Sequence, residues 1–143
     1  MSHRFPTMLV DIDGTIALRG DRDPYAHEHA MEDAVNWPVV YTVDALRATY
    51  GWRIVLVSAR KEKFREITEY WLWKHQIFAG QIDALHMRPN KDQRADQHVK
   101  RDIYFSLVNP TYRVQVVFDD RDRVVKMWRE LGLTCFQVAP GDY

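Results

Sequence analysis

The chain has 143 residues, of which 46% are hydrophobic, so it can bury one core but is short for more than one domain. Its 20 basic and 20 acidic side chains cancel, which excludes a strong overall field that would attract nucleic acid or a membrane surface. We therefore expect one domain over residues 1–143, in which any nucleic-acid contact depends on local cations.

The N-terminal segment and the single cysteine carry no sign of export. The first residues lack the apolar segment of a signal peptide, and no apolar run approaches the length of a membrane span. A lone thiol cannot form an internal disulfide, and the apolar surroundings of Cys135 predict a small core residue. We expect a cytoplasmic protein without membrane contact, in a bacterium or a phage-infected cell.

Apolar runs typical of buried strands alternate along the chain with helical patterns, which predicts an α/β fold. Strands are expected near residues 7–11, 52–57, 83–87, 113–118 and 134–138. Helices are expected between Asn36 and Gly51 and over about 61–74, 98–108 and 121–131. The fold class is a single Rossmann-like domain with a five-stranded, mainly parallel sheet flanked by helices.

Two carboxylates follow the first strand, where Asp11 and Asp13 precede Gly14. Two acids at the carboxyl end of a strand can bind a divalent cation, attack phosphorus and move a proton. A calcium loop would need a glutamate at the twelfth position, which is Arg22, so that interpretation fails on spacing. A simple surface turn stays open as the alternative.

Polar side chains also follow later strands or begin a helix. These motifs are Ser58-Ala59-Arg60 after the second strand, Lys100 at the front of a helix, and Asp119-Asp120 after the fourth strand. Because parallel strands end at one edge of a sheet, Asp11, Ser58 and Asp119 should converge there. The hydrophobic pattern alone therefore predicts a polar site at that edge.

In this order, an acid pair, a serine, a lysine and a second acid pair resemble the four motifs of the haloacid dehalogenase superfamily. Further segments resemble the 3′-phosphatase domain of phage-type polynucleotide kinase-phosphatase: residues 18–25, Ser58-Ala59-Arg60, Asp96 four residues before Lys100, and residues 119–129 and 132–143. The likeness covers nearly the whole chain. No G-x-x-x-x-G-K-[ST] phosphate loop occurs, so we expect no kinase domain, in a free-standing phosphatase or an excised domain.

The resemblance implies a mechanism centred on the first acid pair. Asp11 would attack phosphorus and form an aspartyl-phosphate, while Asp13 would protonate the leaving 3′-oxygen and later activate water. Mg²⁺ would be held by Asp11, the backbone carbonyl of Asp13, and Asp119 or Asp120, with Asp120 favoured as the direct ligand.

The resemblance also implies how substrate would be held. Ser58 and the surrounding amides, including that of Ala59, would bind phosphate oxygens, and Lys100 would balance the charge of nucleophile and phosphoryl group. Arg22 and Arg60 would hold the phosphate or the next nucleotide. Asp96 would fix Lys100 or an arginine through an ion pair.

Three function classes follow from these residues. The first is a polynucleotide 3′-phosphatase acting on DNA or RNA ends in repair, with opening of 2′,3′-cyclic phosphates left open. The second is a phosphatase of small nucleotides or sugar phosphates, and the third is a non-catalytic binding domain, which retention of both Asp11 and Asp13 disfavours. A homodimer and a functional link to a 5′-kinase or a ligase are left open.

The short segment after the first motif predicts a minimal cap and an open site, which suits a bulky polynucleotide end. Cations near the motifs are the candidates for local contacts: Arg19, Arg22, Arg60, Lys61, Lys63, Arg88, Lys91 and Arg94. Aromatic residues that could stack on a base are Tyr25, Trp37 and Trp73, although the core is the commoner place for such side chains.

Overall fold

The computed structural model describes residues 3–143, and its centre is a five-stranded sheet in the order β5-β4-β1-β6-β7. The strands are β1 (Phe5–Val10), β4 (Arg53–Lys61), β5 (Ile82–Arg88), β6 (Tyr112–Asp119) and β7 (Cys135–Gln137). Every neighbouring pair in this sheet is parallel. The predicted fold class is therefore confirmed, and all five strands end at the same edge.

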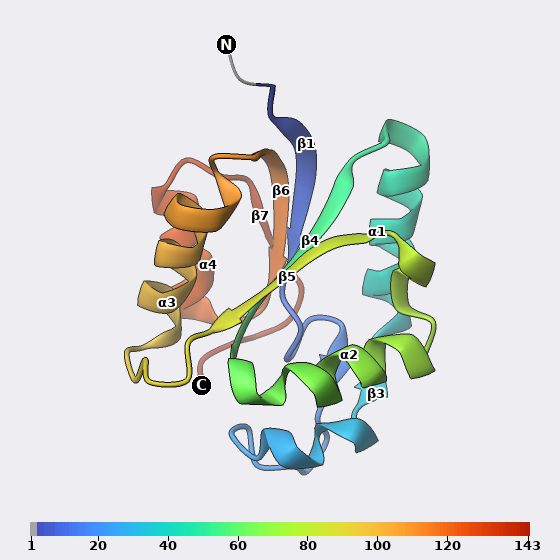
Figure 1. Ribbon diagram of the computed structural model, residues 1–143, viewed down its shortest axis with the longest axis vertical. Helices are drawn as coiled ribbons and strands as arrows, with labels where there is room; N and C mark the ends of the chain where they lie inside the picture. The colour runs from blue at the N-terminus through green and yellow to red at the C-terminus, as the bar shows by residue number, and fades with distance from the viewer. Residues whose placement is uncertain (1–2) are drawn as a thin grey trace.

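Helices cover both faces of the sheet. They are α1 (Trp37–Tyr50), α2 (Arg65–Lys74), α3 (Asp96–Ile103) and α4 (Asp122–Glu130), with shorter turns η1 (His27–Glu32), η2 (Glu62–Phe64), η3 (Ile77–Gly80) and η4 (Tyr104–Val108). Figure 1 shows α3 and α4 on one face, α1 on the other, and α2 beside the strands' carboxyl ends. None of the helices within residues 3–143 has both the length and the apolar character needed to cross a bilayer.

The alternation of side chains along the strands divides the core into two layers. Met8 and Val10 of β1 pack with residues of α1 and α2, whereas Leu9 packs with residues of α3 and α4. Cys135 is 5% exposed and lies in the second layer, as predicted for a core residue. Because both layers are buried, β1 is apolar from Met8 to Val10, and the first charged residue after the strand begins is Asp11.

A small insertion follows β1 and forms the cap. It contains the two-stranded antiparallel hairpin of β2 (Ala17–Leu18) and β3 (Ala34–Val35), with η1 between these strands. Trp71 of α2 donates its indole N–H to the Asp33 carbonyl at 2.9 Å, which fixes the hairpin to the second crossover. The sequence pattern did not predict this hairpin, since two-residue strands are too short to show alternation.

Several predicted boundaries shift. The segment 61–74 begins as the end of β4 and η2, and its α-helix starts only at Arg65. The segment 98–108 starts two residues earlier and closes as a π-helical turn, η4. Helix α1 ends as predicted at Gly51, whose φ of 69° is left-handed.

The preference for placing three aromatic side chains in the core was wrong. Tyr25 is 67% exposed, Trp37 is 40% exposed and Trp73 is 68% exposed. Helix α2 buries Thr68, Trp71 and Leu72, and this places the neighbouring Trp73 on the outer side of the helix.

Candidate active site

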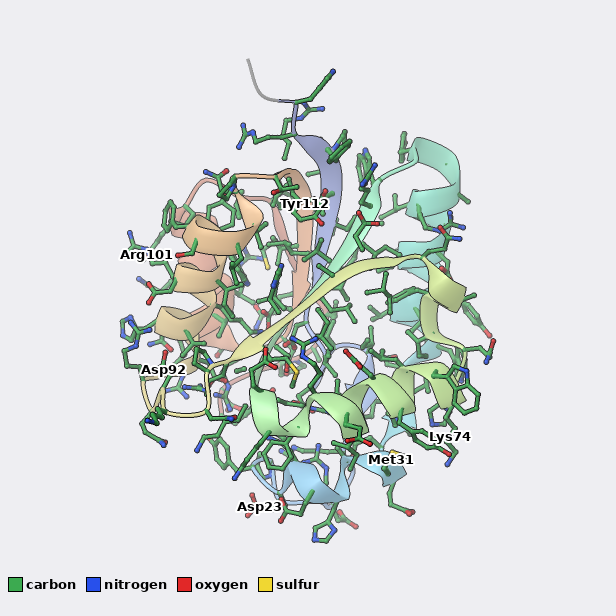
Figure 2. All side chains as sticks on the ribbon, in the orientation of Figure 1. Asp23, Met31, Lys74, Asp92, Arg101 and Tyr112 are labelled. Atoms are coloured by element: carbon green, nitrogen blue, oxygen red, sulfur yellow. The ribbon has the colours of Figure 1, made fainter. Side chains whose placement is uncertain are left out.

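The polar residues that follow the strands gather at their carboxyl edge. Figure 2 shows Asp23 and Asp92 on loops at this lower end of the molecule, and Tyr112 at the opposite end. A cavity of about 690 Å³ opens here, and Asp11, Asp13, Lys100 and Asp120 are among its lining residues. The sequence-predicted convergence of strand ends is therefore present.

Asp11 is fixed at the floor of this cavity. Lys100 Nζ donates to its Oδ1 at 2.7 Å, and Thr15 Oγ1 donates to its Oδ2 at 2.9 Å. The Asp11 backbone N–H donates to the Phe118 carbonyl at 2.9 Å, which continues the β1–β6 ladder by one residue. Both carboxylate oxygens of Asp11 thus have defined directions before any ligand arrives.

Lys100 also joins the two acid motifs. Its Nζ lies 2.9 Å from Asp119 Oδ2, which accepts a second hydrogen bond from the Trp128 indole at 3.1 Å. Burial lowers the pKa of Lys100, but the charges and hydrogen bonds of Asp11 and Asp119 outweigh this and raise it. Lys100 is therefore a permanent buried cation.

Three buried carboxylates lie around this single lysine. Asp11, Asp119 and Asp120 each offer an oxygen within 4.8 Å of the others. Burial, and next the charge of Asp119, hold the pKa of Asp11 well above its usual value, and burial also raises the pKa of Asp120. Since Lys100 can balance only one of the three carboxylate charges, protons or a further cation must balance the others. Hard carboxylate oxygens are the ligands Mg²⁺ prefers, so this donor set fits that ion.

Close backbone approach makes room for the third acid. A Cβ at Gly14, where φ is 82°, would lie 2.1 Å from Asp120 Oδ2. Only glycine combines this left-handed conformation with the space that the Asp120 carboxylate occupies. Gly14 in the first motif therefore leaves the space that the carboxylate of Asp120 in the last motif occupies.

Asp13 stands apart from the acid cluster and is held by arginines. Arg60 donates to both its oxygens, from Nε at 2.9 Å and Nη2 at 2.7 Å, and Arg22 Nη2 lies 3.4 Å from Oδ1. Burial alone would raise the pKa of Asp13. The hydrogen bonds and charge of Arg60, with the charges of His27 and Arg22, outweigh this effect, so the pKa lies below its usual value. In this arrangement Asp13 is ionised.

The two arginines are themselves anchored from behind. Arg22 makes two hydrogen bonds of 2.8 Å to Asp33, and Arg60 Nη1 donates to Thr68 Oγ1 at 2.9 Å. Arg60 is 1% exposed, and its guanidinium reaches the cavity from the core side. The structure thus brings Arg22 and Arg60 to Asp13, and the guanidinium nitrogens of both already donate hydrogen bonds within the protein.

The remaining predicted residues differ in their access to the cavity. Ser58 is 1% exposed, its Oγ accepts the Arg60 amide at 3.1 Å, and it is not among the lining residues in the described chain, whereas Ala59 is. Asp96 pairs with Arg88 Nη2 at 2.7 Å and Arg121 Nη1 at 2.6 Å. Asp96 was expected to pair with Lys100 or with an arginine, and the structure shows it paired with these two arginines.

Some cavity residues were missed by the sequence analysis. Arg88 had been named among the candidate cations and lines the cavity at the end of β5, whereas Arg121, Tyr143 and His27 had not been named individually. Arg121 directly follows the last acid pair. Tyr143 lies in the segment 132–143 that carries part of the resemblance, but the motifs gave it no role, and His27 comes from a segment without a strand or motif signal. Both line the cavity in the folded chain.

The rim of the cavity carries unpaired positive charge. Among residues 3–143, four lining cations form no ion pair: Arg19, Lys61, Lys63 and Arg123. They come from the cap, the end of β4, η2 and α4. In a chain of zero net charge, these cations give the cavity mouth a local preference for anions.

This parallel sheet, with two aspartate motifs and a lysine at one edge, defines a phosphatase domain of the haloacid dehalogenase superfamily. Residues 6–143 match the family model described as the polynucleotide kinase PNKP phosphatase domain, so the chain belongs to that family. The resemblance expected from the motifs is confirmed.

Known relatives agree in sequence and in structure. A protein of Autographa californica nuclear polyhedrosis virus, whose name proposes a bifunctional polynucleotide kinase/RNA ligase, is 33% identical over 139 residues, or 95% of this chain and 20% of its own length. A chain in a Pnkp1/Rnl/Hen1 complex is 37% identical with a TM-score of 0.92, covering 100% of this chain and 49% of its own. A chain in a Pnkp1/Rnl/Hen1 RNA repair complex is 38% identical with a TM-score of 0.91, covering 98% and 44%. The chain thus spans half or less of each relative.

Proposed function

We propose that this domain hydrolyses terminal 3′-phosphomonoesters of polynucleotides through an aspartyl-phosphate on Asp11. The observation that carries the proposal is the fixed Asp11 carboxylate at the floor of an open cavity, between Lys100 and Thr15. A nucleophile that is already oriented reacts faster, because the entropic cost of orienting it is not part of the activation barrier. Family membership supports the phosphatase class.

In the first step an Asp11 oxygen forms a bond to phosphorus, and the bond from phosphorus to the 3′-oxygen breaks. The leaving oxygen takes a proton from Asp13. In the second step water attacks phosphorus, Asp13 accepts its proton, and the acyl-phosphate opens to return the Asp11 carboxylate. Lys100 stabilises the charge on Asp11 and on the phosphoryl group throughout.

The ion pairs of Asp13 define when it can act as an acid. In the free protein Arg60 and Arg22 keep it ionised, which suits the base step. The acid step requires a proton on Asp13, and phosphate oxygens that compete for the same guanidiniums would weaken these ion pairs. We therefore propose that substrate binding itself raises the proton affinity of Asp13.

Mg²⁺ is the cofactor that the acid cluster fits. Asp11, Asp119 and Asp120 would hold it, together with the backbone carbonyl of Asp13 as the resemblance implies. When bound, the ion supplies the positive charge that lets carboxylate and phosphate approach. The residues of the chain would provide the remaining contacts: Lys100 to the nucleophile, and Ala59 and Arg60 near the end of β4 to the phosphate oxygens, with Ser58 behind them.

The rim favours a polynucleotide over a small phosphate ester. Lys61 and Lys63 both line the cavity and form no ion pair within residues 3–143, and Tyr25 and Phe64 add aromatic surface to the same cavity. Phosphates upstream of a 3′ end can contact such cations, and terminal bases can stack on such rings. Since one structural relative is named for an RNA repair complex and the viral relative for a polynucleotide kinase/RNA ligase, we propose RNA ends as the first substrate, with a kinase or ligase as functional partner. Homodimer formation stays a prediction.

The test compares phosphate release from a 3′-phosphorylated oligonucleotide, as RNA and as DNA, with release from a mononucleotide 3′-phosphate. Each reaction is run with Mg²⁺ and with a chelator. We expect release only with the metal, and a higher kcat/KM for the oligonucleotide. Equal efficiency on both lengths would instead identify a small-molecule phosphatase, and absence of release from every ester would favour a binding domain.

A further inference from the structure

Asp120, the second acid of the last motif, is held by a residue 23 positions further along the chain. Tyr143 donates its hydroxyl to Asp120 Oδ2 at 2.6 Å. The ring lies against two guanidiniums, with Arg121 Cζ at 4.2 Å and Arg19 Cζ at 5.9 Å from its centroid. A hydrogen bond to a carboxylate in a half-buried site is strong and directional, so the ring and the acid orient each other.

The segment that carries Tyr143 is itself fixed to the end of β6. A Cβ at Gly141 would lie 1.9 Å from the Asp120 carbonyl oxygen, so the two backbones are in direct contact. The Asp122 amide donates to the Gly141 carbonyl at 2.7 Å, and Gln137 Nε2 donates to the Asp120 carbonyl at 2.9 Å. The hydroxyl of Tyr143 is therefore placed by backbone contacts rather than by a free tail.

Asp120 is confined from the opposite side as well. The backbone of Gly14 approaches so closely that a Cβ there would overlap the carboxylate. With Gly14 on one side and the Tyr143 hydroxyl on the other, the side chain has little room to rotate. Tyr143 needs one carboxylate oxygen of Asp120, which leaves the other for a cation shared with Asp11 and Asp119.

We propose that Tyr143 is a positioning residue that presets Asp120 as a ligand for the divalent cation. The inference rests on the proposed function, since it assumes that the acid cluster binds that cation. Partners that orient a metal ligand commonly contribute 10–100-fold to metal affinity. We expect Tyr143→Phe to weaken cation binding by about 10-fold, because it removes the hydroxyl and keeps the ring beside both arginines.

The experiment measures the dissociation constant of Mn²⁺, a cation that prefers the same oxygen ligands as Mg²⁺, from the free-ion EPR signal without substrate. Four forms of the full chain are compared: wild type, Tyr143→Phe, Asp120→Asn and the double variant. Tyr50→Phe, on the exposed end of α1, is the matched control. Thermal unfolding without metal shows whether each variant is folded.

The expected pattern is weaker binding by Tyr143→Phe, unchanged binding by Tyr50→Phe, and no additional loss when Tyr143→Phe is combined with Asp120→Asn. A Tyr143→Phe constant equal to wild type, with Asp120→Asn impaired, would overturn the positioning role alone. Tighter binding by Tyr143→Phe would also overturn it, because the hydroxyl would then compete with the ion. No binding by the wild type, or full binding by Asp120→Asn, would overturn the proposed metal site itself.

Discussion

Lys100 Nζ donates to Asp11 Oδ1 at 2.7 Å, across 89 positions of sequence. This contact joins the helix α3 to the end of β1 and places a cation beside the proposed nucleophile before any ligand is bound. The same lysine reaches Asp119 at 2.9 Å, so one charge serves two motifs. Because three carboxylates share this one lysine, removal of a carboxylate should change activity and stability in opposite directions, whereas removal of the lysine should lower both.

Asp11→Asn is expected to abolish activity without weakening the fold. The amide cannot attack phosphorus, so turnover should fall by about 10³-fold or more. Removal of one of three clustered carboxylates relieves repulsion, so the free energy of unfolding without metal should be at least that of the wild type. Urea unfolding and phosphate release measure the two effects.

Asp21→Asn is the control for this pair of measurements, since Asp21 is exposed on the cap loop. Asp21→Asn should change neither the turnover nor the free energy of unfolding. A clean Asp11→Asn preparation with turnover near the wild-type rate would exclude Asp11 as the nucleophile.

Lys100→Met is expected to reduce both activity and stability. It leaves Asp11 and Asp119 buried beside Asp120 without their cation, and breaking a buried ion pair in this way costs about 3–5 kcal/mol. Mg²⁺ should restore part of this stability, because it replaces the missing positive charge. Urea unfolding with and without Mg²⁺ tests the prediction, and an unchanged unfolding midpoint would contradict it.

Asp13→Asn tests the role of the ion-paired acid. An ordinary 3′-phosphate needs a proton on its leaving oxygen, whereas the aryl oxide of p-nitrophenyl phosphate leaves without one. We expect the first step to slow by about 10²–10⁴-fold on the 3′-phosphate and far less on the aryl ester. A burst measurement is needed, because Asp13 also serves the second step. Equal losses on both esters would assign Asp13 to structure or metal binding.

The thiol of Cys135 provides a test of the core. Burial, and next the charge of Asp119, raises the pKa of Cys135 to about 12. With the side chain 5% exposed, the native protein should react slowly with a disulfide reagent such as Ellman's, and the urea-unfolded protein rapidly. A native rate close to the unfolded rate would show that β7 is not packed as described.

The fold and the location of the site could be predicted because both depend on local patterns. Buried strands read as apolar runs, and Asp11 and Asp119 come at the point where such runs end. The parallel order then brings these ends to one edge. The sequence is therefore sufficient to place the acid motifs together.

The pairing of charges could not be predicted in the same way. Arg60 reaches Asp13 across 47 positions, and Tyr143 reaches Asp120 across 23, through contacts that exist only after the elements have packed. The placement of Trp73 was wrong because it followed the general preference of aromatic side chains for the core, whereas Trp71 and Leu72 occupy the buried side of α2. These contacts depend on tertiary geometry rather than on local pattern.

The last prediction concerns recognition of a polynucleotide. Lys63 lines the cavity mouth without an ion pair in the described chain, and Lys74 lies at the far end of the same crossover (Figure 2). If Lys63 contacts a phosphate upstream of the 3′ end, kcat/KM on a 3′-phosphorylated oligonucleotide should fall with salt. Lys63→Ala should then reduce the slope of log kcat/KM against log salt concentration by about 0.7, the value for one phosphate contact on a single strand.

A mononucleotide 3′-phosphate lacks that upstream phosphate, so Lys63→Ala should leave its kcat/KM nearly unchanged and narrow the gap between the two substrates. Lys74→Ala removes the same charge from the far end of α2, away from the cavity. It should leave unchanged both the salt dependence and the difference in kcat/KM between the two substrates. Equal salt slopes for wild type and Lys63→Ala would exclude this contact. If, in addition, both substrates show the same efficiency at every salt concentration, the cavity recognises the terminal phosphate alone.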